Sequence, residues 1–147
     1  MPRAIGFALQ TGQWFAGLST GTAFSTRLWD AWNPNRTWVD VRRGDLTGDG
    51  KADLIGRDLN SGQWWASVSM SSGGASSLWD VWSPNVTWAD VQLGDFNGDG
   101  KADLAGPALE TGQWFVALST GSQLHTSEWD AWSTGVTWAD VHTGAFA

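Results

Sequence analysis

Cysteine and tyrosine are absent from this 147-residue sequence, and lysine and arginine are scarce. Without cysteine the chain has no disulfide bond and no thiolate metal site. The eight basic residues stand against fifteen acidic ones, which gives a formal net charge of −7. A nucleic-acid-binding surface needs clustered Lys and Arg, so we expect no nucleic acid partner.

Long apolar runs are missing as well. No stretch reaches the roughly 18 apolar residues that mark a membrane-spanning helix, so no membrane insertion is expected. The first residues lack the apolar segment of a signal peptide. The only histidines, His125 and His142, are not repeated elsewhere in the chain, and no nucleophile motif surrounds the serines. We therefore expect a binding protein and not an enzyme.

Tryptophan and glycine are abundant, with thirteen and nineteen residues. All the tryptophans except Trp65 recur at intervals of fifty residues. They form four columns: Trp14, Trp64 and Trp114; Trp29, Trp79 and Trp129; Trp32, Trp82 and Trp132; and Trp38, Trp88 and Trp138. The chain is therefore three copies of one unit. We place the copies at approximately 1–36, 37–86 and 87–136, followed by 137–147 as a closing strand.

Each copy contains four strand-like runs separated by turns rich in Gly and Ser. In one copy the runs cover residues 87–94, 104–106, 113–119 and 128–132. No stretch has the 3.6-residue period of a helix. Four short antiparallel strands in a repeat of this length are typical of a propeller blade. The sequence therefore predicts an all-β chain that carries three β-propeller blades.

Two acidic turns, residues 45–53 and 95–103, recur within the repeat. In the second turn, oxygen donors alternate and a glycine allows a sharp bend. Its donors are Asp95, Asn97, Asp99, the Lys101 carbonyl and Asp103. An EF-hand would need a bidentate Glu where Gly106 stands. A plain Asn-Gly or Asp-Gly hairpin does not account for three carboxylates that repel one another. We predict a structural calcium site in each turn.

The two ends of the chain fall at matching places in the repeat. Residues 4–6 match residues 54–56, which follow an acidic turn. Residues 141–146 match residues 91–96, which begin one, with Ala145 in place of its first Asp. Closed propellers have about four to eight blades. We expect a six-bladed homodimer in which each closing strand completes the first blade of the other chain. A nine-bladed trimer and a fragment of a longer propeller are the alternatives.

Residues 94–104 closely resemble the FG-GAP or VCBS repeat, which forms the calcium-bearing blades of integrin-α-like β-propellers and of bacterial surface proteins. The segment 111–114 and the Trp129-x-x-Trp132 element look like a Trp-rich bacterial branch. The resemblance covers the whole chain and implies an extracellular or cell-surface location. It also implies two calcium ligand sets: Asp45, Thr47, Asp49, the Lys51 carbonyl and Asp53, with Asp95, Asn97, Asp99, the Lys101 carbonyl and Asp103. Thr47 departs from the usual Asn or Asp. The regular register also fits an engineered or excised propeller fragment.

Two functions remain open at this stage. The first is a calcium-stabilised binding or interaction scaffold with a protein ligand. The second is a lectin, because residues three apart on a strand face opposite sides and would leave one Trp of each pair exposed for stacking on a sugar. These pairs are Trp29 and Trp32, Trp79 and Trp82, and Trp129 and Trp132.

Two sets of aspartates also recur beside the tryptophans. They are Asp30, Asp80 and Asp130, and Asp40, Asp90 and Asp140. A ring of carboxylates along the propeller channel is one interpretation. We favour buried aspartates that accept backbone hydrogen bonds and so fix each blade.

Overall fold

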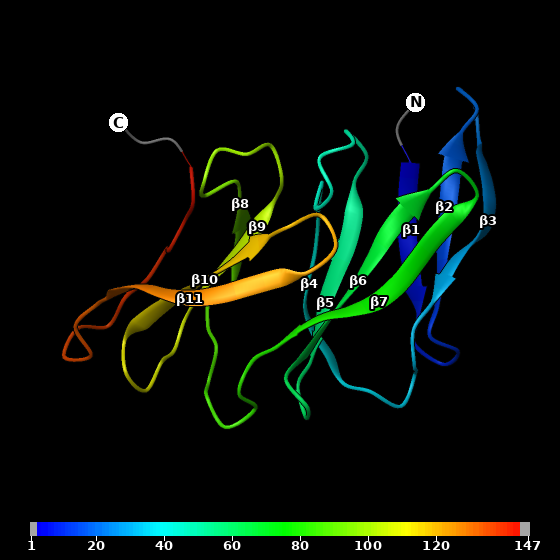
Figure 1. The fold of residues 1–147 in the computed structure, drawn as a ribbon. Coiled ribbons are helices and arrows are strands. Elements are labelled where there is room, and N and C mark those ends of the chain that lie inside the picture. Colours follow the sequence, from blue (N-terminus) through cyan, green and yellow to red (C-terminus); the bar gives the residue numbers. More distant parts are fainter. Residues whose placement is uncertain (1–2, 145–147) are drawn as a thin grey trace.

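A computed structural model describes residues 3–144, and this part of the chain is all-β, with eleven strands (Figure 1). The strands are β1 (Arg3–Ala8), β2 (Gln13–Ser19), β3 (Phe24–Ala31), β4 (Trp38–Gly44), β5 (Asp53–Asp58), β6 (Gln63–Met70), β7 (Gly73–Val81), β8 (Gln92–Gly94), β9 (Asp103–Pro107), β10 (Gln113–Ser119) and β11 (Leu124–Ala131). Among the described residues, no helix is long and apolar enough to cross a membrane. The all-β prediction is confirmed.

The strands form three antiparallel sheets in chain order. They are β1-β2-β3, β4-β5-β6-β7 and β8-β9-β10-β11. Consecutive strands pair throughout, so each sheet is a meander of the kind found in propeller blades. We call them blades 1, 2 and 3. Blade 2 lies between the other two (Figure 1), since β7 contacts both β3 and β11. An isolated bridge between Trp88 and Ala108 extends the short pairing of β8 with β9.

Blade 1 has three strands where the other two blades have four. The predicted closing strand, residues 137–147, runs past the described residues, and Ala145 lies outside them. Residues 137–144 belong to no strand, but they lie beside β8. Gln92 Nε2 donates to the Val141 carbonyl at 3.4 Å, and Thr143 Oγ1 donates to the Leu93 carbonyl at 3.2 Å.

Tryptophans of one blade pack onto glycines of the next. A Cβ added to Gly56 would lie 2.8 Å from the ring of Trp32, and one added to Gly106 would lie 3.1 Å from the ring of Trp82. These rings close the space between blades. A residue larger than glycine would collide with the Trp32 ring at Gly56 and would have to displace the Trp82 ring at Gly106. The buried core is accordingly divided into two clusters, one across blades 1 and 2 and one across blades 2 and 3.

Both members of the first two Trp pairs are buried, so the expected exposed member is absent from blades 1 and 2. Their side chains, Trp29, Trp32, Trp79 and Trp82, are at most 8 % exposed. The period-two argument was wrong because a β-bulge in β3 places Leu28 and Asp30 opposite consecutive residues of β2, and because Trp32 follows the end of β3 at Ala31. There the backbone turns, and the Trp32 N–H donates to the Gly12 carbonyl at 2.7 Å. Leaving the strand lets both indoles face the next blade.

A polar contact accompanies each buried pair. Trp32 Nε1 donates to Ser76 Oγ of blade 2 at 2.9 Å, and that hydroxyl donates to Asp30. Between blades 2 and 3, Trp82 Nε1 donates to Thr126 Oγ1 at 2.9 Å, and Thr126 donates to Asp80. Asp30 and Asp80 each accept a backbone N–H as expected, from the residue that follows them, but both are half-buried where full burial was expected. Their second role, in joining blades, was not predicted.

The turn before the third strand of blades 2 and 3, and before the matching strand β2 of blade 1, requires glycine. Gly62 has a φ of +74°, and a Cβ there would lie 1.7 Å from the carbonyl oxygen of Trp82. Gly12 and Gly112 repeat this arrangement under Trp32 and Trp132. The close approach lets the Trp82 N–H donate to the Gly62 carbonyl at 2.8 Å, which fixes the indole against the next blade.

We predict that Gly62→Ala destabilises the fold far more than Gly21→Ala. Gly21 also has a positive φ, +94°, but has nothing within 4 Å of its added Cβ. Gly21→Ala should lower the free energy of unfolding by about 1–2 kcal/mol, the cost of a left-handed backbone conformation for alanine. Gly62→Ala should lower it by about 1–3 kcal/mol more, because the new Cβ overpacks the turn. Urea unfolding followed by tryptophan fluorescence measures both, and equal losses would contradict the role given to the Trp82 carbonyl.

Candidate functional site

The two acidic turns lie at the same place in blades 2 and 3, between the first and second strands. In the first turn, the carboxylate of Asp45 accepts the backbone N–H groups of Gly48 at 2.7 Å, Asp49 at 3.1 Å and Gly50 at 2.7 Å. Burial alone would raise the pKa of Asp45, but these backbone donors hold it below its ordinary value. The backbone of the loop therefore curves around the carboxylate of Asp45, which binds three of its N–H groups.

Asp53, the last carboxylate of the first turn, is fully buried. It accepts the Leu46 N–H and the Ser69 N–H, each at 2.8 Å, and so joins the turn to β6. Burial raises the pKa of Asp53 above its ordinary value, and the neighbouring carboxylates of Asp49 and Asp45 raise it further. A nearby cation would oppose this effect, because it would favour the charged carboxylate.

The second turn repeats this arrangement. Asp95 accepts the N–H groups of Gly98, Asp99 and Gly100 at 2.8–3.1 Å. Its buried Asp103 accepts the N–H groups of Phe96 at 2.9 Å and Ser119 at 2.7 Å, and its pKa is raised by burial. In addition, Ser119 Oγ donates to the Leu46 carbonyl at 2.6 Å, so blade 3 holds the first turn of blade 2.

The donors of both turns suit calcium in kind, because all of them are oxygen atoms. Their arrangement is less complete: no group of three acidic or histidine side chains among the described residues gathers around a common point. Asp49 and Asp99 are instead each engaged by the backbone N–H two residues later, that of Lys51 or Lys101, at 2.9 Å. In the second turn, Lys101 Nζ also lies 3.5 Å from the carboxylate of Asp99.

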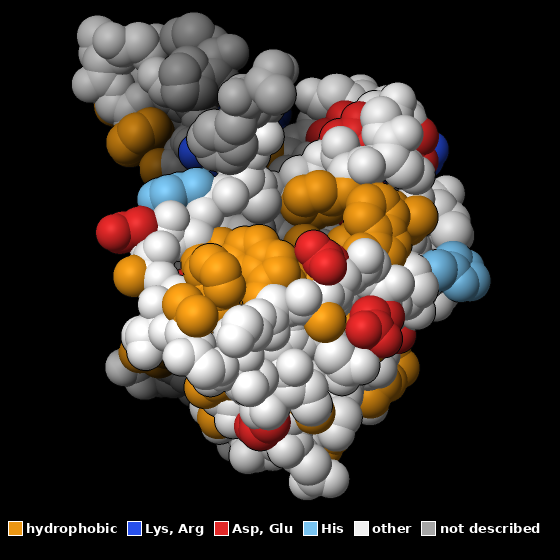
Figure 2. Space-filling view, turned by 90° about the vertical axis from the view of Figure 1, so that its left-hand side faces the viewer, with side chains coloured by type: hydrophobic (Ala, Val, Ile, Leu, Met, Phe, Trp, Pro, Cys, Tyr) orange, Lys and Arg blue, Asp and Glu red, His pale blue; other side chains and the backbone are white. Residues whose placement is uncertain are grey.

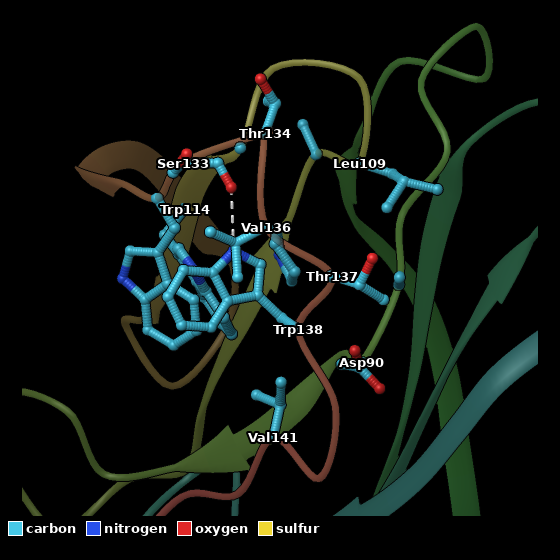
Figure 3. Close-up of a pocket in the computed structure, with 14 residues that line it drawn as sticks. Asp90, Leu109, Trp114, Ser133, Thr134, Val136, Thr137, Trp138 and Val141 are labelled. Carbon is cyan, nitrogen blue, oxygen red and sulfur yellow. Dashed lines mark hydrogen bonds between the residues drawn. The ribbon is translucent and has the colours of Figure 1, made fainter.

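A cavity of about 260 Å³ lies in blade 3 beside the last described segment (Figure 3). Trp114, Trp132 and Trp138 line it together with Asp90 and Val141. Figure 3 shows the ring of Trp138 at the centre of the group, held by its Nε1 donating to the Ser133 carbonyl at 3.0 Å. Trp132, from the predicted ligand-binding set, thus does line a cavity, together with aromatic residues from other columns.

This cavity exists because blade 3 lacks an arginine that blade 2 has. In blade 2, Arg57 Nη2 lies 2.7 Å from Asp40 Oδ2, and the guanidinium lies 5.8 Å from the centroid of the Trp64 ring. Fifty residues on, Pro107 replaces Arg57, which opens the space beside Asp90. The expectation that Asp40 accepts backbone hydrogen bonds is wrong, since within residues 3–144 its carboxylate accepts only from Nε and Nη2 of this arginine.

A second cavity, of about 400 Å³, lies between blades 2 and 3 and is lined by Trp82, Val86, Trp88 and Phe115 among others. The matching place between blades 1 and 2 is filled by Arg36. Its guanidinium lies 5.4 Å from the centroid of the Trp65 ring and its Nη1 donates to Asp58 at 3.3 Å.

Neither cavity was predicted from the sequence, although a signal was present. Arg36 and Arg57 break the repeat, because the residues fifty positions later are Val86 and Pro107. Both changes replace a long charged side chain with a short apolar one. Such positions in a regular repeat mark where one copy has space that another fills.

Comparison with known proteins finds one family. Residues 45–106 match the family model described as the FG-GAP-like repeat, and this range runs from the first acidic turn through the second and most of β9. No curated protein and no solved structure matches the chain. The closer assignment to a Trp-rich bacterial branch stays a prediction. The match over residues 45–106, together with the repeated acidic turns and three blade-like sheets, is consistent with an FG-GAP-type repeat protein.

Proposed function

We propose that this repeat protein is a calcium-stabilised binding scaffold that acts outside the cell or at its surface. The observation that carries the proposal is the pair of acidic turns with the same backbone fold, each presenting only oxygen donors. The FG-GAP-like match supports the extracellular location, since such repeats typically occur in extracellular proteins. The role is binding and not catalysis.

Calcium would be held by the donors of each turn. The first set is Asp45, Thr47, Asp49, the Lys51 carbonyl and Asp53, and the second is Asp95, Asn97, Asp99, the Lys101 carbonyl and Asp103. The ion would supply positive charge that offsets the repulsion among three carboxylates in nine residues. Because each turn joins the first two strands of its blade, this charge would stabilise the blade as a whole.

We predict that millimolar calcium raises the melting temperature relative to chelator. A hundredfold excess over Kd contributes about 2.7 kcal/mol for each site, or about 5.4 kcal/mol for the two sites, which corresponds to roughly 10–20 °C for a chain of this size. The double variant Asp49→Asn and Asp99→Asn should lose this response but keep its melting temperature in chelator. Scanning calorimetry measures both, and identical curves with calcium and chelator for the unchanged protein would exclude stabilisation by calcium.

Asp53→Asn supplies the matched comparison. The buried carboxylate accepts two backbone N–H groups, one on each oxygen, and an amide nitrogen cannot accept either. We predict a loss of about 1–3 kcal/mol even in chelator, because a buried donor is left without a partner. A variant that is destabilised only when calcium is present would show that the backbone bonds of Asp53 contribute little.

Carbohydrate binding is the second candidate, and the cavity of blade 3 favours it. Three tryptophans and one aspartate line this space, which combines flat apolar walls with a hydrogen-bonding group. Sites of this kind bind small ligands by apolar contact and orient them through a few polar groups. Of the tryptophans first considered, Trp132 lines this cavity and Trp82 the other, whereas Trp29, Trp32 and Trp79 are buried and Trp129 is exposed at the end of blade 3.

We predict that Pro107→Arg abolishes glycan binding on an array at millimolar calcium. The new arginine would fill the blade 3 cavity as Arg57 fills the same place in blade 2, with Asp90 as its ion partner. Val86→Arg is the matched control, since it fills the second cavity as Arg36 does between blades 1 and 2 and leaves the first cavity open. Glycan binding that persists in the Pro107→Arg variant would exclude this cavity as the sugar site. If the unchanged protein binds no glycan on the array, the lectin function is excluded.

A further inference from the structure

The last blade exposes side chains that are buried in the two blades before it. Trp29 is 8 % exposed and Trp79 is 2 % exposed, because each is covered by the following blade. Trp129, at the same position of blade 3, is 49 % exposed. Figure 2 views the molecule from this end and shows hydrophobic side chains gathered at the centre of the face. The end of blade 3 therefore has the chemistry of an internal blade-to-blade contact.

The opposite end of the chain presents the matching half of that contact. Gly6 on β1 has nothing within 4 Å of an added Cβ, whereas its counterparts Gly56 and Gly106 are covered by tryptophans of the preceding blade. Next to it, Ile5 is 39 % exposed, while Ile55 at the same place in blade 2 is fully buried. The open surface over Gly6 therefore corresponds to the surfaces over Gly56 and Gly106, which Trp32 and Trp82 cover inside the chain.

The polar contact between blades is also split between the two ends. Inside the chain, Trp32 and Trp82 donate to a hydroxyl of the next blade. Trp132 donates instead to Asp130 of its own blade, at 3.3 Å. The hydroxyl that corresponds to Ser76 and Thr126 is Thr26, on exposed β3 at the other end of the chain.

The segment after blade 3 is placed to become the missing inner strand of blade 1. This segment lies beside β8, where Thr143 Oγ1 donates to the Leu93 carbonyl. Strand β4 lies on the other side of β8, and there Arg42 Nη2 donates to the Val91 carbonyl at 3.4 Å. In blade 2, Arg43 pairs with Leu54 and Arg42 with Ile55. The same register places Thr143 opposite Ala4 and His142 opposite Ile5 of β1.

We propose that the partner of these two end faces is a second copy of this chain. Trp132 of one copy covers Gly6 of the other, Thr26 completes the Asp130 contact, and residues 138–144 pair with β1. Two copies joined head to tail in this way form two identical junctions and close a ring. Six blades fall within the about four to eight of known propellers, whereas three and nine do not.

Light scattering on the unchanged chain tests the proposal, and we expect twice the chain mass of 15.8 kDa. Gly6→Leu should halve the measured mass, because the new side chain has room in the single chain and obstructs Trp132 of the partner. Gly135→Asn is the matched control and should stay dimeric, since Asn35 and Asn85 stand at that position in the internal contacts. A monomer, or a dimer that Gly6→Leu leaves intact, would overturn the proposal. Three times the chain mass would overturn the six-bladed ring.

Engineered cysteines supply a second measurement that does not depend on mass alone. The native chain has no cysteine, so Ala4→Cys with Thr143→Cys introduces a single pair. Residues directly opposite in antiparallel strands are about 4.5–5.5 Å apart at Cα, which suits a disulfide. We expect covalent dimers on non-reducing gels, and none from Ala4→Cys with Thr134→Cys. A disulfide formed only within one chain would show that the strand completes its own blade 1 and would refute pairing between copies.

Discussion

The packing of a tryptophan from one blade onto a glycine of the next is the contact on which the rest of this structure depends. A sheet of a few short strands cannot bury both of its faces alone, and here the faces between neighbouring blades are covered by indole rings. Trp32 fits over Gly56 and Trp82 over Gly106 because glycine leaves room for the flat ring. The burial of such a ring removes a large apolar area from water, which accounts for the high number of tryptophans, thirteen, in a chain with no tyrosine.

The polar groups of the molecule act in support of this packing. Asp30 and Asp80 hold a hydroxyl of the next blade, and that hydroxyl in turn holds the indole N–H. The buried Asp53 and Asp103 fix the acidic turns to the third strands of their blades. The turns are thus built into the blade by their own hydrogen bonds. A bound cation would add to a loop that is already folded, and its contribution would be one of charge neutralisation.

Differences among the three copies, more than their common features, create the two cavities in and beside blade 3. Arg57 and Arg36 fill cavities in the earlier part of the chain and bring their charge to Asp40 and Asp58. Pro107 and Val86 leave the corresponding spaces open in and beside blade 3. The aromatic rings that the arginines contact in blade 2, Trp64 and Trp65, have aromatic counterparts in Trp114 and Phe115, so both cavities keep an aromatic wall.

The sequence by itself determined the all-β class, the fifty-residue repeat and the positions of the acidic turns, because these follow from local periodicity and from turn residues such as Gly98 and Gly100. It could not determine which tryptophans reach solvent. That depends on Trp32 lying just beyond the end of β3, where the alternation of a strand no longer holds, and on whether another blade covers the ring. The carboxylates of Asp45 and Asp95 could be predicted as cation ligands from their spacing, but their bonds to three backbone N–H groups arise only once the turn is folded. The cavities likewise required the tertiary structure, since each is lined by residues from several strands and turns, and only the fold shows which side chain fills the matching place in another blade.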